Sequence, residues 1–178
     1  MEKFVVSDTN IFIDLINIDV LDIFFQLPWE IHTTDMIVSE FTDENQKKAI
    51  LGHSELVIKR YEPEELSDLV DFHTKHSQVS INDCSVWQYA KQNNYVLLSG
   101  DGYLRKLTIS DGIEVRGTIF VIEQLVDHGF LTAAEGADVL DKLKNTNTRQ
   151  PLNEIQDRIR RMRAESNNME GNNMQKKI

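Results

Sequence analysis

Short apolar segments alternate with segments of helical periodicity along most of this chain. Four apolar segments predict strands, at residues 4–7, 29–33, 95–98 and 113–116. Residues 56–58 fit either a further strand or a linking turn. Strands that alternate with helices are typical of a parallel sheet whose two faces are both covered. The predicted fold class is therefore α/β, with helices on both sides of a central, mostly parallel sheet.

The segments between these strands predict helices with recognisable ends. Leu27 and Pro28 end the first helix, because proline cannot continue a helical hydrogen-bond ladder. Thr132 and Glu135 form a capping box at the start of a later helix. The predicted helices cover residues 10–26, 35–48, 63–76, 80–92, 117–128, 132–144 and 153–163.

The length of 178 residues suits one domain with a hydrophobic core of its own. Residues 1–163 contain no internal repeat and no domain boundary, so we assign them to one domain. From Ala164 onward asparagine and glutamine dominate and there is little apolar surface to bury. We therefore predict a flexible polar tail over residues 164–178.

Three features predict a cytoplasmic protein that makes no membrane contact. The longest apolar stretch, residues 11–25, is interrupted by acidic and amide side chains and is too polar to span a bilayer. The first residues lack the pattern of a secretory signal. The lone cysteine, Cys84, cannot form an internal disulfide, which suits a reducing compartment.

The formal net charge of −10 restricts the function. An acidic protein gains little non-specific affinity for nucleic acid. An enzyme of this charge that acts on nucleic acid needs a bound cation and a local basic surface. Otherwise its substrate is small, or the charge serves another purpose.

Four short segments each carry one carboxylate toward the same predicted edge of the sheet. Asp8 and Asp101 follow predicted strands, whereas Glu40 and Asp83 lie in the first turns of predicted helices. Carboxylates gathered at the ends of parallel strands repel one another, and a hard divalent cation among them relieves that repulsion. This arrangement points to metal-dependent phosphodiester chemistry.

Each carboxylate also has an ordinary structural explanation. Asp8 fits a helix N-cap, Glu40 a solvated helix position, and Asp83 a capping box with Ser80. Asp101 precedes a glycine, as in many turns. The functional interpretation therefore depends on the four acids meeting at one place.

The sequence resembles the PIN domain family of metal-dependent nucleases, which includes VapC-type toxins. The resemblance rests on residues 5–10, Glu40, Asp83 and residues 97–101, and it spans roughly residues 4–163. A Thr or Asn often stands where this chain has Gly100. The family implies a PIN-like α/β/α sandwich and an acidic pocket that holds Mg²⁺ or Mn²⁺.

The resemblance assigns roles to individual residues of this chain. Asp8, Glu40, Asp83 and Asp101 would be the catalytic acids. The metal would bind Asp8, Asp83 and Asp101, with Glu40 bound directly or through water. Asn10 and Ser99 would be supporting polar residues.

The implied activity is that of a metal-dependent endoribonuclease, the toxin of a type II toxin–antitoxin pair. Arg105 and Lys106 follow Asp101 by one helical turn and are candidates for contacts with RNA. An antitoxin would cover the acidic pocket, for example by inserting an arginine. Apolar positions in the first predicted helix support either a homodimer or ordinary core packing; they are Ile16, Leu21, Phe24 and Phe25.

Two alternatives of other classes stay open at this point. A haloacid-dehalogenase-like phosphatase also begins with an acid after its first strand, but it needs a second acid where this chain has Asn10. A PIN-like fold that has lost its acids serves as a non-catalytic binding module, and here all four acids are present. The residues do not distinguish RNA from structured DNA as the substrate.

Overall fold

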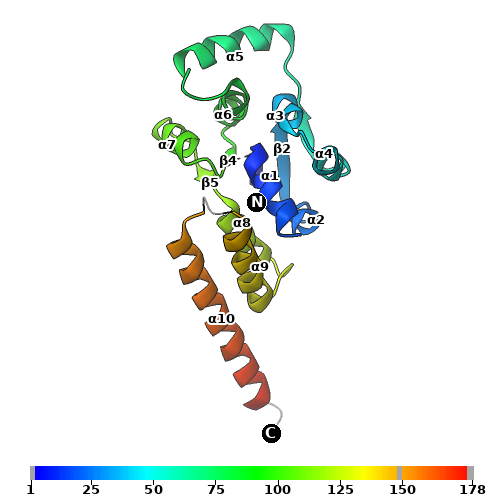
Figure 1. The fold of residues 1–178 in the computed structure, drawn as a ribbon, viewed down its shortest axis with the longest axis vertical. Coiled ribbons are helices and arrows are strands. Elements are labelled where there is room, and N and C mark those ends of the chain that lie inside the picture. The colour runs from blue at the N-terminus through cyan, green and yellow to red at the C-terminus, as the bar shows by residue number, and fades with distance from the viewer. Residues whose placement is uncertain (1–2, 148–149, 176–178) are drawn as a thin grey trace.

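The computed structural model describes residues 3–147 and 150–175, and its centre is a five-stranded sheet (Figure 1). All strand pairs are parallel, and the order across the sheet is β3-β2-β1-β4-β5. The predicted strands are confirmed, and residues 57–59 form a strand. The strands are β1 (Lys3–Ser7), β2 (Trp29–Thr34), β3 (Val57–Lys59), β4 (Val96–Leu98) and β5 (Val115–Arg116).

Helices cover both faces of this sheet, which confirms the predicted α/β sandwich. One helix, α6, packs on β1, β2 and β4 and is itself covered by α5, while α1, α8 and α9 pack with one another. The helices are α1 (Thr9–Asn17), α2 (Leu21–Phe24), α3 (Asp35–Glu40), α4 (Glu44–Leu51), α5 (Pro63–Lys75), α6 (Ile81–Asn93), α7 (Gly102–Ser110), α8 (Thr118–Asp127), α9 (Ala133–Thr146) and α10 (Leu152–Gln175).

The strand order places a topological switch point between β1 and β4. The chain builds outward from β1 to β2 and β3, then crosses back to form β4 on the other side of β1. The Asp8 N–H donates to the Leu98 carbonyl at 3.0 Å, so the carboxyl ends of β1 and β4 lie at the same level. In open parallel sheets, ligands bind beyond this point.

The core explains why the central strands are apolar without alternation. Val5 and Val6 of β1 are fully buried, as are Leu97 and Leu98 of β4. Successive strand residues point to opposite faces, so both faces of β1 and β4 are covered.

The predicted helix over residues 10–26 is two helices in the structure. Asp19 adopts a positive φ of 60°, which a right-handed helix does not allow. The Val20 N–H donates to the Leu15 carbonyl at 3.0 Å, which closes the end of α1 as in a Schellman motif. Aspartate tolerates the left-handed conformation better than most residues, and the buried Val20 anchors the turn.

The predicted helix over residues 35–48 is also interrupted. Thr34 caps α3, which ends at Glu40. Phe41 then adopts an extended conformation and is buried in the core, and Asp43 caps α4 with its side chain. Burial of the Phe41 ring therefore outweighs the continuation of the helix.

The apolar positions of the first predicted helix belong to the core. Leu21, Phe24 and Phe25 are buried, and Ile16 is partly buried against the same cluster. Core packing therefore accounts for these residues, which was the second of the two explanations that the sequence left open.

Two further observations concern the ends and the surface of the chain. The last helix continues past the predicted end at residue 163, to Gln175, because no proline interrupts it. The flexibility predicted for residues 164–178 stays a prediction, and residues 176–178 lie outside the described residues. Within residues 3–147 and 150–175, no helix is both long enough and apolar enough to cross a membrane.

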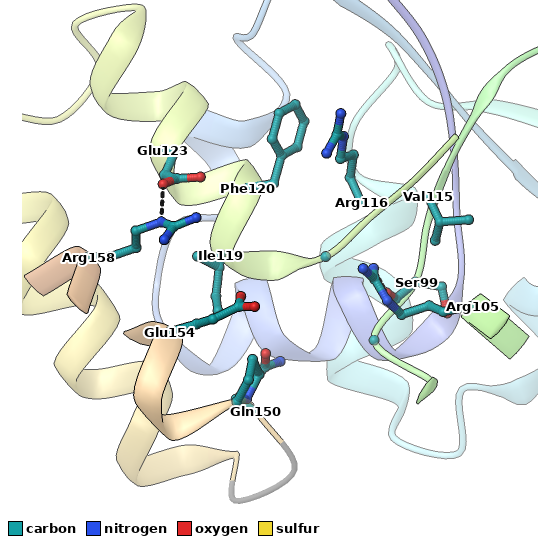
Figure 2. Close-up of a pocket in the computed structure, with 13 residues that line it drawn as sticks. Ser99, Arg105, Val115, Arg116, Ile119, Phe120, Glu123, Gln150, Glu154 and Arg158 are labelled. Carbon is teal, nitrogen blue, oxygen red and sulfur yellow. Dashed lines mark hydrogen bonds and ion pairs between the residues drawn. The ribbon is translucent and has the colours of Figure 1, made fainter. Parts of the chain in front are cut away.

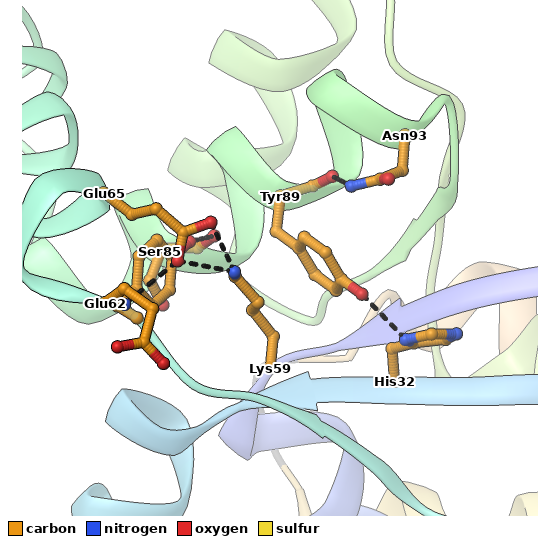
Figure 3. A network of polar contacts seen from close by, with 8 residues as sticks. His32, Lys59, Glu62, Glu65, Ser85, Tyr89 and Asn93 are labelled. Carbon is orange, nitrogen blue, oxygen red and sulfur yellow. Dashed lines mark hydrogen bonds and ion pairs between the residues drawn. The ribbon is translucent and has the colours of Figure 1, made fainter.

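A set of polar contacts joins α5 and α6 to the β2–β3 side of the sheet (Figure 3). Lys59 pairs with Glu65 at 2.5 Å between Nζ and Oε1, next to β3. The Tyr89 hydroxyl lies 3.0 Å from Nδ1 of His32 on β2. The first contact holds α5 against β3, and the second holds α6, which carries Asp83, against β2.

A buried carboxylate joins the C-terminal helices to α1. Asp14 is 4% exposed and accepts three side-chain hydrogen bonds. The Thr118 hydroxyl donates at 2.7 Å, the Asn147 amide at 2.7 Å and the Gln150 amide at 2.9 Å. Hydrogen bonds to an ionised group are stronger than neutral ones, and an unmade bond leaves a buried donor unsatisfied.

We predict that Asp14→Ala lowers the free energy of unfolding by about 2–4 kcal/mol, since three donors lose their acceptor. Asp138→Ala on α9 is the control, because the Asp138 side chain is 77% exposed, and it should change stability by less than about 0.5 kcal/mol. Urea unfolding followed by circular dichroism measures both. Equal stability of the two variants would contradict the assigned role of Asp14.

Candidate active site

Asp8 lies at the centre of the candidate site, directly after β1. Its side chain is an N-cap of α1, because Oδ1 accepts the Ile11 N–H at 3.0 Å. The Ser99 hydroxyl donates to Oδ2 at 2.6 Å. Asp8 is 1% exposed, so the ordinary capping role and a buried functional position coexist in one residue.

Burial raises the pKa of Asp8 from 3.8 to about 7. The hydrogen bonds from Ser99 and Ile11 oppose this shift, because they stabilise the ionised form. The negative charges of Asp83 and Asp14 add to it. Asp8 is therefore the acid whose charge is hardest to maintain without a nearby cation.

Asp83 lies in the first turn of α6, as predicted, and Ser80 caps that helix. The Ser80 hydroxyl donates to Oδ2 of Asp83 at 2.8 Å and accepts the Asp83 N–H at 3.0 Å. Burial raises the pKa of Asp83, and the charges of Glu40 and Asp101 raise it further. The charges of all four predicted acids are thus coupled to one another through Asp83.

Glu40 is the sixth and last residue of α3, so it lies beyond the first turn of that helix. It nevertheless faces the site. The Thr9 hydroxyl donates to its Oε2, and the Asn82 amide donates to its Oε1 at 2.9 Å. Thr9 follows Asp8 and Asn82 precedes Asp83, so Glu40 bridges the two segments that carry the other acids.

Asp101 is the N-cap of α7, three residues after the end of β4. Its Oδ1 accepts the N–H groups of Tyr103 at 2.9 Å and Leu104 at 2.7 Å. Across the described ranges, no hydrogen-bond donor reaches Oδ2. One oxygen therefore holds the helix while the other is available to a ligand.

Ser99 connects three parts of the site. Its hydroxyl donates to Asp8 and accepts the Asp101 N–H at 3.2 Å, while its carbonyl accepts Nη1 of Arg105 at 3.1 Å. Its own N–H donates to the Arg116 carbonyl at 2.9 Å. Ser99 thereby sets the separation between Asp8 and Asp101.

The other predicted site residues are placed less uniformly. Asn10 is exposed in the first turn of α1 and lines a cavity of about 380 Å³ together with Asp101 and Arg105. A Cβ atom at Gly100 would lie 3.8 Å from Cβ of Asn10, so a small residue keeps this side of the site open. Lys106 is exposed on α7 and lines neither this cavity nor an adjoining cavity between β5, α7, α8 and α10.

Sequence reasoning missed Thr9 and Asn82, the two residues that hold Glu40. Each is the direct neighbour of a predicted acid, and this position in the sequence could have marked both as candidate site residues. Their bonds to Glu40 join segments 31 and 42 residues apart, so a local pattern does not reveal them.

Comparison with known proteins assigns the fold to a family. The PIN domain family model matches residues 4–164. This chain belongs to the PIN domain family. No curated protein matches the chain significantly.

Solved structures similar to this PIN domain come from bacteria and archaea. PAE2754 from Pyrobaculum aerophilum is 13% identical with a TM-score of 0.51, and the match covers 71% of this chain and 99% of that one. This identity shows the shared fold alone.

Two further solved structures are similar to this PIN domain. VapBC2 from Rickettsia felis, bound to a DNA fragment from their promoter, is 15% identical with a TM-score of 0.46, covering 64% of this chain and 98% of that one. FitAcB from Neisseria gonorrhoeae is 13% identical with a TM-score of 0.38, covering 62% and 95%.

The donor chemistry of this PIN domain suits a hard divalent cation. Among the described residues, no three carboxylate, imidazole or thiol groups stand close enough together to form a metal-binding set. Mg²⁺ typically binds through one or two carboxylates and keeps several waters, so it does not require a three-carboxylate cage. Asp8 and the unbonded oxygen of Asp101 lie on either side of Ser99 and fit that requirement.

We predict that Asp8→Asn changes how stability depends on pH. The raised pKa of Asp8 means that the folded state keeps a proton which the unfolded state releases, so wild-type stability falls as pH rises from about 4 to about 7. The Asp8→Asn variant has no carboxyl group at this position and therefore does not lose stability over this pH range. Its melting temperature in EDTA should exceed that of the wild type at about pH 8, and the difference between the two melting temperatures should narrow toward about pH 5. A gap independent of pH would refute the raised pKa.

Proposed function

We propose that this PIN domain is a metal-dependent nuclease that hydrolyses phosphodiester bonds in RNA. The observation that carries the proposal is the electrostatic coupling of four acids at the β1–β4 switch point. Burial and the charges of Glu40 and Asp101 raise the pKa of Asp83, and burial and the charge of Asp83 raise that of Asp8. Repulsion of this kind disfavours folding unless a cation is bound.

In the proposed site, Asp8 and Asp101 hold Mg²⁺ or Mn²⁺ directly, and Asp83, the third acid that the sequence assigns to the metal, contacts the ion through water, because no three such groups stand close enough together among the described residues. A bound ion of this kind supplies Lewis acidity and an acidified water. The chain's own groups set the geometry. Ser99 orients Asp8, Ser80 orients Asp83, and the first turn of α7 orients Asp101. Glu40, held by Thr9 and Asn82, contacts the ion directly or through water.

The proposed products carry a 5′ phosphate and a 3′ hydroxyl, because water attacks the phosphorus, the bond to the 3′ oxygen breaks, and that oxygen leaves and takes up a proton as the 3′ hydroxyl. The buried carboxylate of Asp8 and the oriented carboxylates around it fix where that water attacks. A phosphatase of the haloacid-dehalogenase type is not favoured, since an amide, Asn10, stands where its second acid would be.

The resemblance of the sequence to VapC-type proteins supports a biological role as the toxin of a type II toxin–antitoxin pair. The partner would be an antitoxin that covers the acidic pocket with a cationic side chain. Detection of a small open reading frame next to this one, whose product binds the protein and blocks cleavage, tests this role.

We expect Asp8→Asn and Asp101→Asn to lose RNA cleavage by about a hundredfold or more, as when a preorganised electrostatic group is removed. Asp138→Asn, an exposed position on α9, is the matched control and should keep wild-type activity. Gel assays on labelled RNA with Mn²⁺, followed by mapping of the product ends, measure the rate and the end groups. Undiminished cleavage by Asp8→Asn would exclude the proposed site.

We also expect Mn²⁺ to raise the melting temperature of the wild type, because a ligand that binds only the folded state stabilises it. At a hundred times the dissociation constant the gain is about 2.7 kcal/mol. Asp83→Asn should show a much smaller gain, and EDTA should reverse the effect in the wild type. An equal gain in both proteins would place the ion elsewhere.

A further inference from the structure

A second cavity adjoins the one that contains Asp101, and Ser99 and Arg105 form part of its wall (Figure 2). Its volume is about 470 Å³, and its walls come from β5, α7, α8 and α10. Gly100 and Arg105 line both this cavity and the one that contains Asp101, so the two adjoin. A strand bound at the acidic site can therefore continue into this cavity.

Three arginines from distant parts of the chain converge on this cavity. Arg105 comes from α7, Arg116 from the end of β5 and Arg158 from α10. Two glutamates, Glu123 and Glu154, also line it, so the lining carries a formal excess of one positive charge in a chain whose formal charge is −10. Glu114, which pairs with Arg116, lies outside the lining. The cavity is therefore a candidate for the local basic surface that an acidic nuclease requires.

The arginines keep donors available for a ligand. Arg105 bonds the Ser99 carbonyl through Nη1 and forms no ion pair among the described residues. Arg116 bonds Glu114 through Nε at 2.9 Å, and Arg158 bonds Glu123 through Nε at 2.6 Å. A guanidinium has five N–H donors in a fork that matches phosphate oxygens, so several remain in each case.

The start of α8 adds positive potential to the same wall. Gly117 is its N-cap and contributes no side-chain cap, and a Cβ atom there would lie 3.5 Å from Nη1 of Arg105, so this helix start lies beside that guanidinium. Such a helix start favours an anion.

We propose that this cavity binds a backbone phosphate of the RNA strand, next to the phosphate that is cleaved. The inference rests on the proposed nuclease function and extends it, because it assigns a substrate-binding role to Arg116 and Arg158. Arg105 links the cavity to the acidic site, since its guanidinium donates a hydrogen bond to the Ser99 carbonyl and the Ser99 hydroxyl donates one to Asp8. The cavity is thus a subsite that anchors the strand, while the acids act on the neighbouring bond.

The test measures binding in EDTA, where cleavage does not interfere. Fluorescence anisotropy with a labelled single-stranded RNA is recorded at several salt concentrations. Arg116→Gln and Arg158→Gln should each weaken binding about five- to tenfold and lower the magnitude of the salt slope by about one. Arg163→Gln is the control, because Arg163 lies on α10 outside the cavity and pairs with Asp138; it should bind like the wild type.

Arg116→Lys and Arg158→Lys separate charge from fold, since each should recover the salt slope. Equal affinity and slope in the wild type and both glutamine variants would overturn the subsite, as would absence of RNA binding by the wild type. Displacement of the RNA by polyglutamate with the same dependence on Arg116 and Arg158 would also overturn it, and would assign the cavity to an acidic protein segment.

A parallel assay of cleavage with Mn²⁺ keeps the two proposals apart. Arginine-dependent RNA binding without cleavage by the wild type would support the subsite and reject the nuclease. Cleavage by the wild type that both glutamine variants retain at an unchanged KM would support the nuclease and reject the subsite.

Discussion

The cost of burying carboxylates at one edge of the sheet, to which their mutual repulsion adds, is the constraint on which the rest of this structure depends. Asp8 is buried at the switch point between β1 and β4, and its pKa of about 7 corresponds to a cost of several kcal/mol for its charge. That value already includes the hydrogen bonds from Ser99 and the first turn of α1, which favour the charged form. The folded state therefore prefers a proton or a cation at this position.

Hydrogen bonds from neighbouring residues hold the segments that carry the acids near one another. Thr9 and Asn82 bind the two oxygens of Glu40, and each sits beside another acid, so three segments are joined at the edge. On the far side, Asp14 ties α1 to α8 and to the segment before α10. The same packing that stabilises the C-terminal helices thereby places α10 at the cavity that adjoins the acidic site.

Charge is distributed unevenly around this edge in a way that suits a polyanionic substrate. Asp8 and Arg105, one of the three arginines that line the adjoining cavity, meet at Ser99, whose hydroxyl donates to Asp8 and whose carbonyl accepts a hydrogen bond from Arg105. An acidic protein repels nucleic acid at long range, so its affinity for nucleic acid must come from short-range contacts of this kind. Under the proposed function, the substrate would bind where the acids and Arg105 lie next to one another.

The apolar runs and the helix caps determined the α/β class and most element positions, because these depend on local periodicity and short-range hydrogen bonds, whereas the order of the acids predicted the quartet only through the family resemblance. Local patterns could not show that α1 ends at Asn17 and the chain turns at Asp19, or that Phe41 interrupts the second predicted helix, since burial of Val20 and Phe41 decides both. Nor could they show that Thr9 and Asn82 hold Glu40, or that Arg116 and Arg158 share a cavity with Arg105. Those contacts join residues far apart in the chain, and only the packing of helices onto the sheet brings such residues together.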